Sequence, residues 1–135
     1  MTTVPTRESL TVEFKSDESR LPDDDLVEAV VCMTNAEGGV IYLGVEDDGR
    51  VTGLHAKHKD LRGLPAMIAN RTRPPVTVGV TSIDHPDGRV AEITVPKATR
   101  IVSTSQGLIK RRRLAWDGRP ECVALLPEEH TSRLS

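Results

Sequence analysis

The sequence predicts a mixed α/β (α+β) fold, with a single mixed β-sheet flanked by two main helices and a short C-terminal helix. An unbroken apolar run at 40–45 follows a Gly-Gly pair, as expected of a strand buried on both faces. A strong hairpin signal at 85–88 adds two antiparallel strands. With 135 residues, the chain fits one domain over 1–135, and we expect 1–7 to form a flexible tail.

The first strand and the first helix have clear sequence signals. Apolar and polar residues alternate over 9–15, which predicts a half-buried strand. Pro22 suits the first turn of a helix, and the three aspartates at 23–25 suit its positive N-terminal end. We expect this helix to end at Gly38-Gly39, because glycine readily adopts the left-handed conformation of a helix cap.

The central strand is expected at Val40–Val45, and an Asp47-Asp48-Gly49 turn then leads into a short strand at 51–54. A second helix is predicted over 57–70, although Pro65 favours a helix that begins there, with only a turn before it. The other expected elements are hairpin strands at 76–83 and 89–95, a short strand or loop at 101–104, a strand at 108–112, a turn at 116–119, an extended segment at 121–125 and a terminal helix at 127–134.

Composition limits the classes of partner. A net charge of −2 predicts no strong global attraction to nucleic acid, and an aromatic content of 2% argues against a base-stacking platform. No apolar run approaches the roughly 20 residues that span a bilayer, and residues 1–7 show no secretory signal, so we expect a cytoplasmic protein without membrane contact. In a reducing cytosol, Cys32 and Cys122 are then expected to be free thiols.

An acidic group is the first candidate site. Glu8 and Glu13 lie near the first strand, and Asp47 or Asp48 follows the central strand. Three converging carboxylates repel one another unless a cation lies between them, and hard oxygen ligands suit Mg²⁺ or Mn²⁺. Glu8 and Glu13 have opposite parity, so convergence requires a turn or bulge at Glu8. Lys15 lies two residues beyond Glu13, where its ammonium could contact a phosphate.

A cationic run is the second candidate site. The run comprises Lys110, Arg111, Arg112 and Arg113, and such cations neutralise phosphates without reading sequence. We expect nucleic-acid contact here, and the arginines that can join it are Arg71, Arg73, Arg100 and Arg119. The alternative is a charged edge strand that resists aggregation. The four histidines are expected in solvated loops: His55, His58, His85 and His130. The sequence contains no phosphate-binding loop or other cofactor motif.

The motifs together resemble a known family. Five parts of the sequence follow one another in the order seen in the Schlafen AlbA_2 domain, which is also called divergent AAA-4 and described as DNA-binding. They are Glu8, Glu13-Phe-Lys15, Asn35-Ala-Glu-Gly38-Gly39, Leu43-Gly-Val-Glu-Asp47-Asp-Gly49 and Gly53. Some Schlafen proteins are metal-dependent RNA endonucleases that use two glutamates and an aspartate. The resemblance implies that Glu8, Glu13 and Asp47, with Asp48 as the alternative, would fill these roles beside Lys15.

Three functions follow as expectations. The first is a regulatory or defence-related domain that binds DNA or RNA through backbone phosphates. The second is an Mg²⁺- or Mn²⁺-dependent endonuclease in which Glu8, Glu13 and Asp47 bind the metal and, together with Lys15, are the catalytic residues. The third is a protein-interaction module. Because Schlafen cores pair two related lobes and this chain has one, we also expect a two-fold homodimer.

Overall fold

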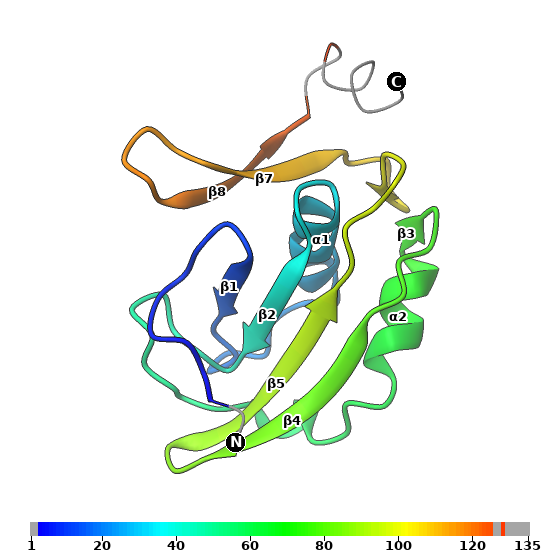
Figure 1. The fold of residues 1–135 in the computed structure, drawn as a ribbon. Coiled ribbons are helices and arrows are strands. Elements are labelled where there is room, and N and C mark those ends of the chain that lie inside the picture. Colours follow the sequence, from blue (N-terminus) through cyan, green and yellow to red (C-terminus); the bar gives the residue numbers. More distant parts are fainter. Residues whose placement is uncertain (1–2, 126–127, 129–135) are drawn as a thin grey trace.

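The computed structural model of the protein describes residues 3–125 and 128 (Figure 1). Its main elements are the four strands of the principal sheet and two α-helices packed behind them. In chain order the elements are β1 (Val12–Lys15), α1 (Asp23–Thr34), β2 (Gly39–Leu43), the 3₁₀ turn η1 (Ala56–His58), α2 (Leu64–Asn70), β3 (Thr72–Arg73), β4 (Gly79–His85), β5 (Gly88–Val95), β6 (Ser103–Thr104), β7 (Lys110–Leu114) and β8 (Pro120–Ala124).

The principal sheet is mixed, in the order β1-β2-β5-β4, which confirms the predicted class. β1 runs parallel to β2, whereas β5 is antiparallel to both β2 and β4. β2 is thus an inner strand, and Ile41, Leu43 and Val45 are each fully buried. Val40, predicted to be as buried as its neighbours, is only half-buried. The sheet therefore has the expected centre, with its N-terminal end closer to solvent.

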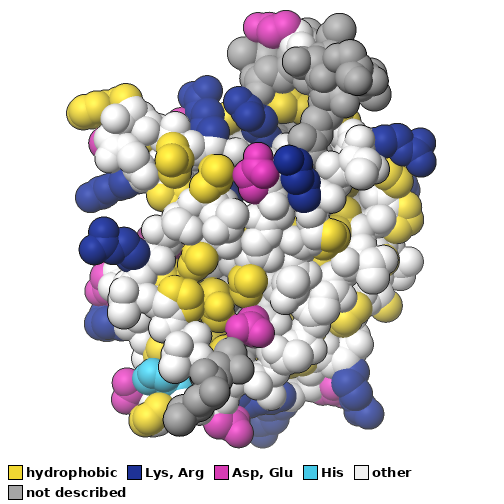
Figure 2. Space-filling view, viewed as in Figure 1, with side chains coloured by type: hydrophobic (Ala, Val, Ile, Leu, Met, Phe, Trp, Pro, Cys, Tyr) yellow, Lys and Arg dark blue, Asp and Glu magenta, His cyan; other side chains and the backbone are white. Residues whose placement is uncertain are grey.

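The two faces of this sheet pack differently. Helices α1 and α2 cover one face, where Val30, Ile41 and Ile93 belong to a large apolar core. The other face carries a smaller cluster around Phe14 and Tyr42, whose rings meet edge to face at 6.3 Å. Half-buried valines pack around this cluster. Figure 2 shows apolar side chains at the surface near the middle of the face in view. The helices therefore lie on one side of the sheet only.

Several predicted boundaries shift for local reasons. α1 ends at Thr34, and Gly38 then takes the left-handed conformation, with its N–H donating to the carbonyl of Met33. The second helix is shorter than 57–70 because Pro65 occupies its first turn, as the alternative start predicted. Two small sheets, β3-β6 and β7-β8, stand apart from the principal sheet, so the prediction of a single sheet was wrong. The predicted terminal helix at 127–134 lies outside the described residues except for Glu128.

The β7-β8 hairpin is attached at three points to α1 and its C-cap residue Asn35, and Figure 1 shows the hairpin crossing one end of the helix and sheet. Asn35 donates a hydrogen bond to the carbonyl of Lys110, and the ammonium of Lys110 pairs with Glu28. A disulfide joins Cys32 to Cys122, which corrects the expectation of free thiols. α1 therefore fixes the position of the hairpin relative to the sheet.

A buried carboxylate holds the loop after β2 in place. Asp17 is fully buried and accepts hydrogen bonds from the backbone N–H groups of Leu21 and His55. Oδ2 of Asp17 lies 2.7 Å from Nδ1 of His58, and His58 is only 5% exposed. The prediction that His58 is a solvated loop residue was therefore wrong. Among the described residues, no helix combines the length and apolarity needed to cross a bilayer.

Candidate functional site

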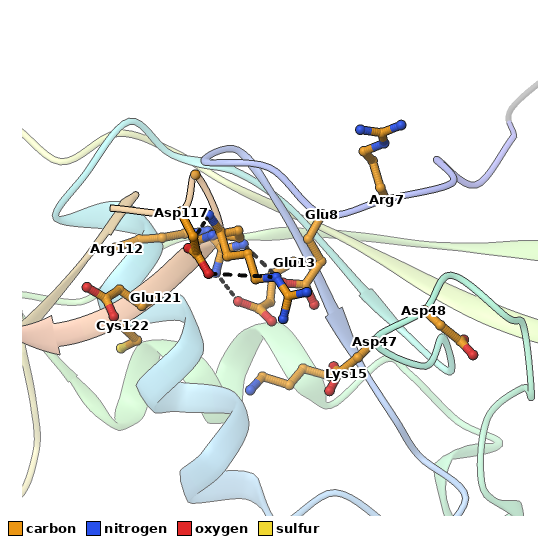
Figure 3. Close-up of a pocket in the computed structure, with 13 residues that line it drawn as sticks. Arg7, Glu8, Glu13, Lys15, Asp47, Asp48, Arg112, Asp117, Glu121 and Cys122 are labelled. Atoms are coloured by element: carbon orange, nitrogen blue, oxygen red, sulfur yellow. Dashed lines mark hydrogen bonds and ion pairs between the residues drawn. The ribbon is translucent and has the colours of Figure 1, made fainter. Parts of the chain in front are cut away.

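A polar cleft of about 840 Å³ lies between the start of β1, the turn after β2 and the β7-β8 hairpin (Figure 3). The predicted residues Glu8, Glu13, Lys15 and Asp47 all line it. The hairpin supplies the opposite wall through Arg112 and the residues of its turn. The cleft therefore brings together segments far apart in the sequence, and its remaining charged lining residues are Arg7, Asp48, Asp117, Arg119 and Glu121.

A turn before β1 brings Glu8 beside Glu13. Ser9 and Val12 bond to each other through both backbone groups, with N···O distances of 3.0 and 3.3 Å. This turn leaves Glu8 outside the strand, where strand parity does not apply, and its Oε1 accepts a hydrogen bond from the N–H of Phe14 at 3.3 Å. The turn that convergence required at Glu8 is thus present.

Arg112 lies at the centre of this acidic pair. Its side chain is 3% exposed, and its guanidinium pairs with Glu13 and lies 3.6 Å from Oε2 of Glu8. The same guanidinium donates to the carbonyls of Ser9, Leu10 and Val12. The sequence predicted Arg112 as a phosphate contact, but a guanidinium enclosed in this way is directed inward and has little access to a ligand.

Glu8 is the strongly perturbed acid of the cleft. Its pKa is raised from 4.5 to about 7, chiefly by burial and next by the nearby charge of Glu13. The N–H of Phe14 and the charge of Arg112 act in the opposite direction, while Asp47 contributes a smaller upward shift. Glu8 therefore exchanges a proton near neutral pH, as general acids and bases do.

The structure distinguishes Asp47 from Asp48. Both side chains are exposed and line the cleft, but Asp48 is paired with Arg50, at 2.9 Å from its Nε. In Figure 3, Asp48 points away from Glu8 and Glu13. Asp47 acts on the titration of Glu8. Asp47 is thus the aspartate associated with the acidic pair.

The carboxylates do not form a preformed metal cage. Among residues 3–125 and 128, no group of three or more His, Cys, Asp and Glu side chains is arranged to hold a metal ion. Glu8 and Glu13 instead face the guanidinium of Arg112, which supplies the positive charge that converging carboxylates require. The residues as arranged therefore do not fit the expected Mg²⁺ or Mn²⁺ ion.

The cations of the predicted nucleic-acid site are engaged with protein groups. In the hairpin, Lys110 pairs with Glu28, and Arg113 pairs with Glu121 at 2.9 Å. The half-buried Arg111 also has an interaction partner. This pattern agrees with the alternative of a charge-paired strand as much as with a phosphate-binding one. A phosphate role for the run stays a prediction.

Arg71 and Arg73 lie on the α2–β3 side of the molecule and do not line the cleft. Arg71 pairs with Asp24 at 2.9 Å, and Arg73 donates to the carbonyls of Asn70 and Thr72. Sequence reasoning grouped Arg119 with the cationic run and missed Arg7, and both line the cleft. Arg7 directly precedes Glu8, but only the turn before β1 and the position of the hairpin bring these two arginines to one site.

The fold and the cleft define a small α+β domain with an acidic pair held against a buried arginine. Residues 8–115 match the family model of the Schlafen AlbA_2 domain, and the chain belongs to this family. The match includes Glu8, Glu13, Asp47 and Arg112, so the whole acidic pair and its arginine lie inside the family domain. No curated protein matches the chain.

Several solved structures are similar to this chain, including the following two. One is a crystal structure of the DIP2311 protein from Corynebacterium diphtheriae, with 25% sequence identity, a TM-score of 0.69, and coverage of 85% of this chain but 25% of that one. The other is a solution NMR structure of the N-terminal domain of a protein from Nitrosomonas europaea that is named as related to the ATP-dependent DNA helicase RecG. It is 22% identical with a TM-score of 0.54, and the match covers 67% of this chain and 65% of that domain. The chain thus spans a quarter of the DIP2311 chain.

Proposed function

We propose that this AlbA_2 domain binds nucleic acid through backbone phosphates at the rim of the cleft. The observation that supports this proposal is the placement of Arg7, Lys15 and Arg119 around the acidic pair. Within the described part of the chain, neither Arg7 nor Lys15 has an ion-pair partner. Arg119 has an 87% exposed side chain and only a distant contact, 3.9 Å, with Asp117. Such cations can contact phosphates without first giving up a strong internal partner.

The uneven charge of the chain supports the same location. Residues 1–48 contain 3 cations and 12 acids, whereas residues 49–135 contain 15 cations and 8 acids. The cleft lies where the acidic segment 1–48 meets the basic β7-β8 hairpin (Figure 3). Because the acids limit long-range attraction, we expect few phosphate contacts and a modest affinity.

Fluorescence anisotropy with labelled single-stranded DNA, duplex DNA and tRNA tests this proposal. With about three phosphates neutralised, log K against log salt should have a slope of about −2 to −3. Changing Arg7, Lys15 and Arg119 together to Gln should weaken binding to every sequence and remove most of that slope. The matched control changes Lys57, Lys59 and Arg62, which lie outside the cleft, to Gln and should retain binding. If the control variant loses more affinity than the cleft variant, the nucleic-acid interface lies at the surface that carries Lys57, Lys59 and Arg62.

The same samples also test the other two expectations, the protein-interaction module and the homodimer. Binding of none of the three probes, with an unchanged fold, would favour the protein-interaction module. Light scattering on the same samples tests the expected homodimer, since a monomer mass at high micromolar concentration would exclude it.

Phosphodiester cleavage is a second candidate function, and the proton exchange of Glu8 near pH 7 favours it. In this proposal, Glu8 transfers a proton in the cleft while Lys15 contacts the phosphate. Labelled tRNA and DNA incubated with the protein in EDTA or in Mn²⁺ test it. Cleavage that Glu8→Gln abolishes would support the role of Glu8, and a requirement for Mn²⁺ would identify a metal-dependent endonuclease. If the substrates stay intact in both buffers, the cleavage function is rejected and nucleic-acid binding remains as the proposed function.

A further inference from the structure

We propose that Arg112 is the resident cation of the acidic site, holding Glu8 and Glu13 together in the position that a divalent metal ion would otherwise take. This inference concerns how the site is neutralised and does not depend on nucleic-acid binding. It rests on three observations: the enclosure of the guanidinium, its simultaneous contact with both glutamates, and the anchoring of β7 from the opposite side.

The contacts of Arg112 use all three nitrogens of its guanidinium. Nε donates to the carbonyls of Ser9 and Leu10 at 3.2 and 3.0 Å. Nη2 donates to the carbonyls of Ser9 and Val12 at 2.8 and 2.7 Å and approaches Glu8, while Nη1 pairs with Glu13. The planar arrangement of arginine donors suits such a set of acceptors, which a spherical ion could not reproduce.

These contacts connect the charge of the site to its shape. The carbonyls of Ser9, Leu10 and Val12 belong to the turn that brings Glu8 beside Glu13. Arg112 therefore stabilises the turn and neutralises the carboxylates with the same group. A metal ion in this position would have to displace the guanidinium from the part-buried carbonyls of Ser9, Leu10 and Val12, and the turn would lose those four hydrogen bonds.

The other side of the hairpin keeps Arg112 in place. Asn35 donates to the carbonyl of Lys110 at 2.8 Å, two residues before Arg112. Cys122, the residue directly opposite Arg112 in the hairpin, is bonded to Cys32 of α1. Because both attachments lead to α1, the backbone that carries Arg112 cannot easily withdraw from the acidic pair.

The direction in which Glu13→Gln changes the melting temperature tests the proposal, and this measurement needs no metal. If Arg112 is the resident cation, Glu13→Gln removes the main partner of a buried guanidinium and lowers the melting temperature. If the carboxylates instead form an uncompensated site awaiting an ion, the same change relieves repulsion and raises it. The matched control is Glu121→Gln, which removes an exposed pair with Arg113 and should change the melting temperature little. An increase for Glu13→Gln would overturn the proposal.

Mn²⁺ titration provides an independent readout. The wild-type protein should show no rise in melting temperature and no binding heat at millimolar Mn²⁺, because Arg112 occupies the site. Arg112→Gln should melt at a lower temperature and regain part of the loss in Mn²⁺, since a ligand of the folded state stabilises it. Adding Glu8→Gln and Glu13→Gln to that variant should abolish the gain. Stabilisation of the wild type by Mn²⁺ that Glu13→Gln removes would refute the proposal even if Arg112→Gln fails to fold.

Discussion

Arg112 and Cys122 are directly opposed residues in the β7-β8 hairpin, and each is fixed by a different part of the molecule. Arg112 binds the turn before β1, whereas Cys122 forms a disulfide with Cys32 of α1. The hairpin is therefore held between the N-terminal turn and the helix at the position that carries the buried arginine. The site and the disulfide are one connected structural unit.

Removal of the disulfide should lower stability substantially. The bond links residues 90 positions apart, and chain entropy alone predicts a loss of up to roughly 4–5 kcal/mol for a loop of that size. We expect this decrease for the Cys32→Ala, Cys122→Ser double variant in urea unfolding. The wild type in dithiothreitol should approach the same midpoint, and the variant should not respond to the reductant. A wild-type midpoint that dithiothreitol leaves unchanged would contradict a stabilising role for the bond.

The stability of the protein should depend on Glu8 between about pH 4.5 and pH 7. Burial raises the pKa of Glu8 from 4.5 to about 7 in the folded state, so the folded protein binds more protons than the unfolded chain in this window. The contribution of Glu8 is therefore full below pH 4.5 and is lost as the pH rises through 7. The difference amounts to at most about 3 kcal/mol, at about 1.4 kcal/mol for each pKa unit.

Urea melts of the wild type and Glu8→Gln across this window measure that contribution. The stability of the wild type minus that of Glu8→Gln should fall as the pH rises, because glutamine cannot lose a proton. Subtracting the variant removes the opposite trends of other carboxylates, such as Asp60, whose pKa Arg62 lowers to about 2. A difference that is constant with pH would show that Glu8 titrates normally in the folded protein.

Loss of the Asp17 carboxylate should destabilise the loop after β2. Asp17→Ala leaves His58 and two backbone N–H groups without their buried acceptor, at a cost of roughly 3–5 kcal/mol. Asp60→Ala is a suitable control, because Asp60 forms its pair with Arg62 at the surface. Thermal unfolding of both variants distinguishes them. Equal and small changes would show that the Asp17–His58 contact contributes little.

Local sequence patterns predicted the principal sheet well. The apolar run around Ile41 and the turn residues near Gly88 depend on neighbours in the chain, so periodicity and turn chemistry were sufficient to find β2 and the β4-β5 hairpin. The family motif also identified Glu8, Glu13 and Asp47, which the structure brings to one cleft. Their chemical role stays a prediction.

The pairing of distant residues could not be predicted in this way. A run of four cations gives no indication that Arg112 is buried against Glu13, 99 residues earlier, while its neighbour Arg113 remains exposed. Likewise, an expected compartment suggested free thiols, whereas the packing of the hairpin on α1 joins Cys32 to Cys122. Both contacts depend on where the β7-β8 hairpin packs in the fold, and local sequence patterns do not predict that position.

The side chain of Asn35 should be one of the most sensitive in the protein. It is 4% exposed, and its amide donates to the carbonyls of Val102 and Lys110, both at 2.8 Å. Its oxygen accepts from the N–H of Val102 at 2.9 Å. Asn35→Ala would leave these backbone groups unpaired in the interior, and we expect a loss of about 2–4 kcal/mol in urea unfolding. The control Asn70→Ala, at an exposed helix end, should be nearly neutral.

The same residue also links α1 to the acidic site, which a second measurement can detect. Asn35→Asp keeps the oxygen that Val102 requires but directs a carboxylate at two carbonyls, so it should be at least as destabilising as Asn35→Ala. In both variants, hydrogen exchange of the β7 amides should accelerate more than that of β2, because β7 loses its attachment at Lys110. If β7 and β2 accelerate equally, Asn35 stabilises the fold as a whole and does not position the strand that carries Arg112.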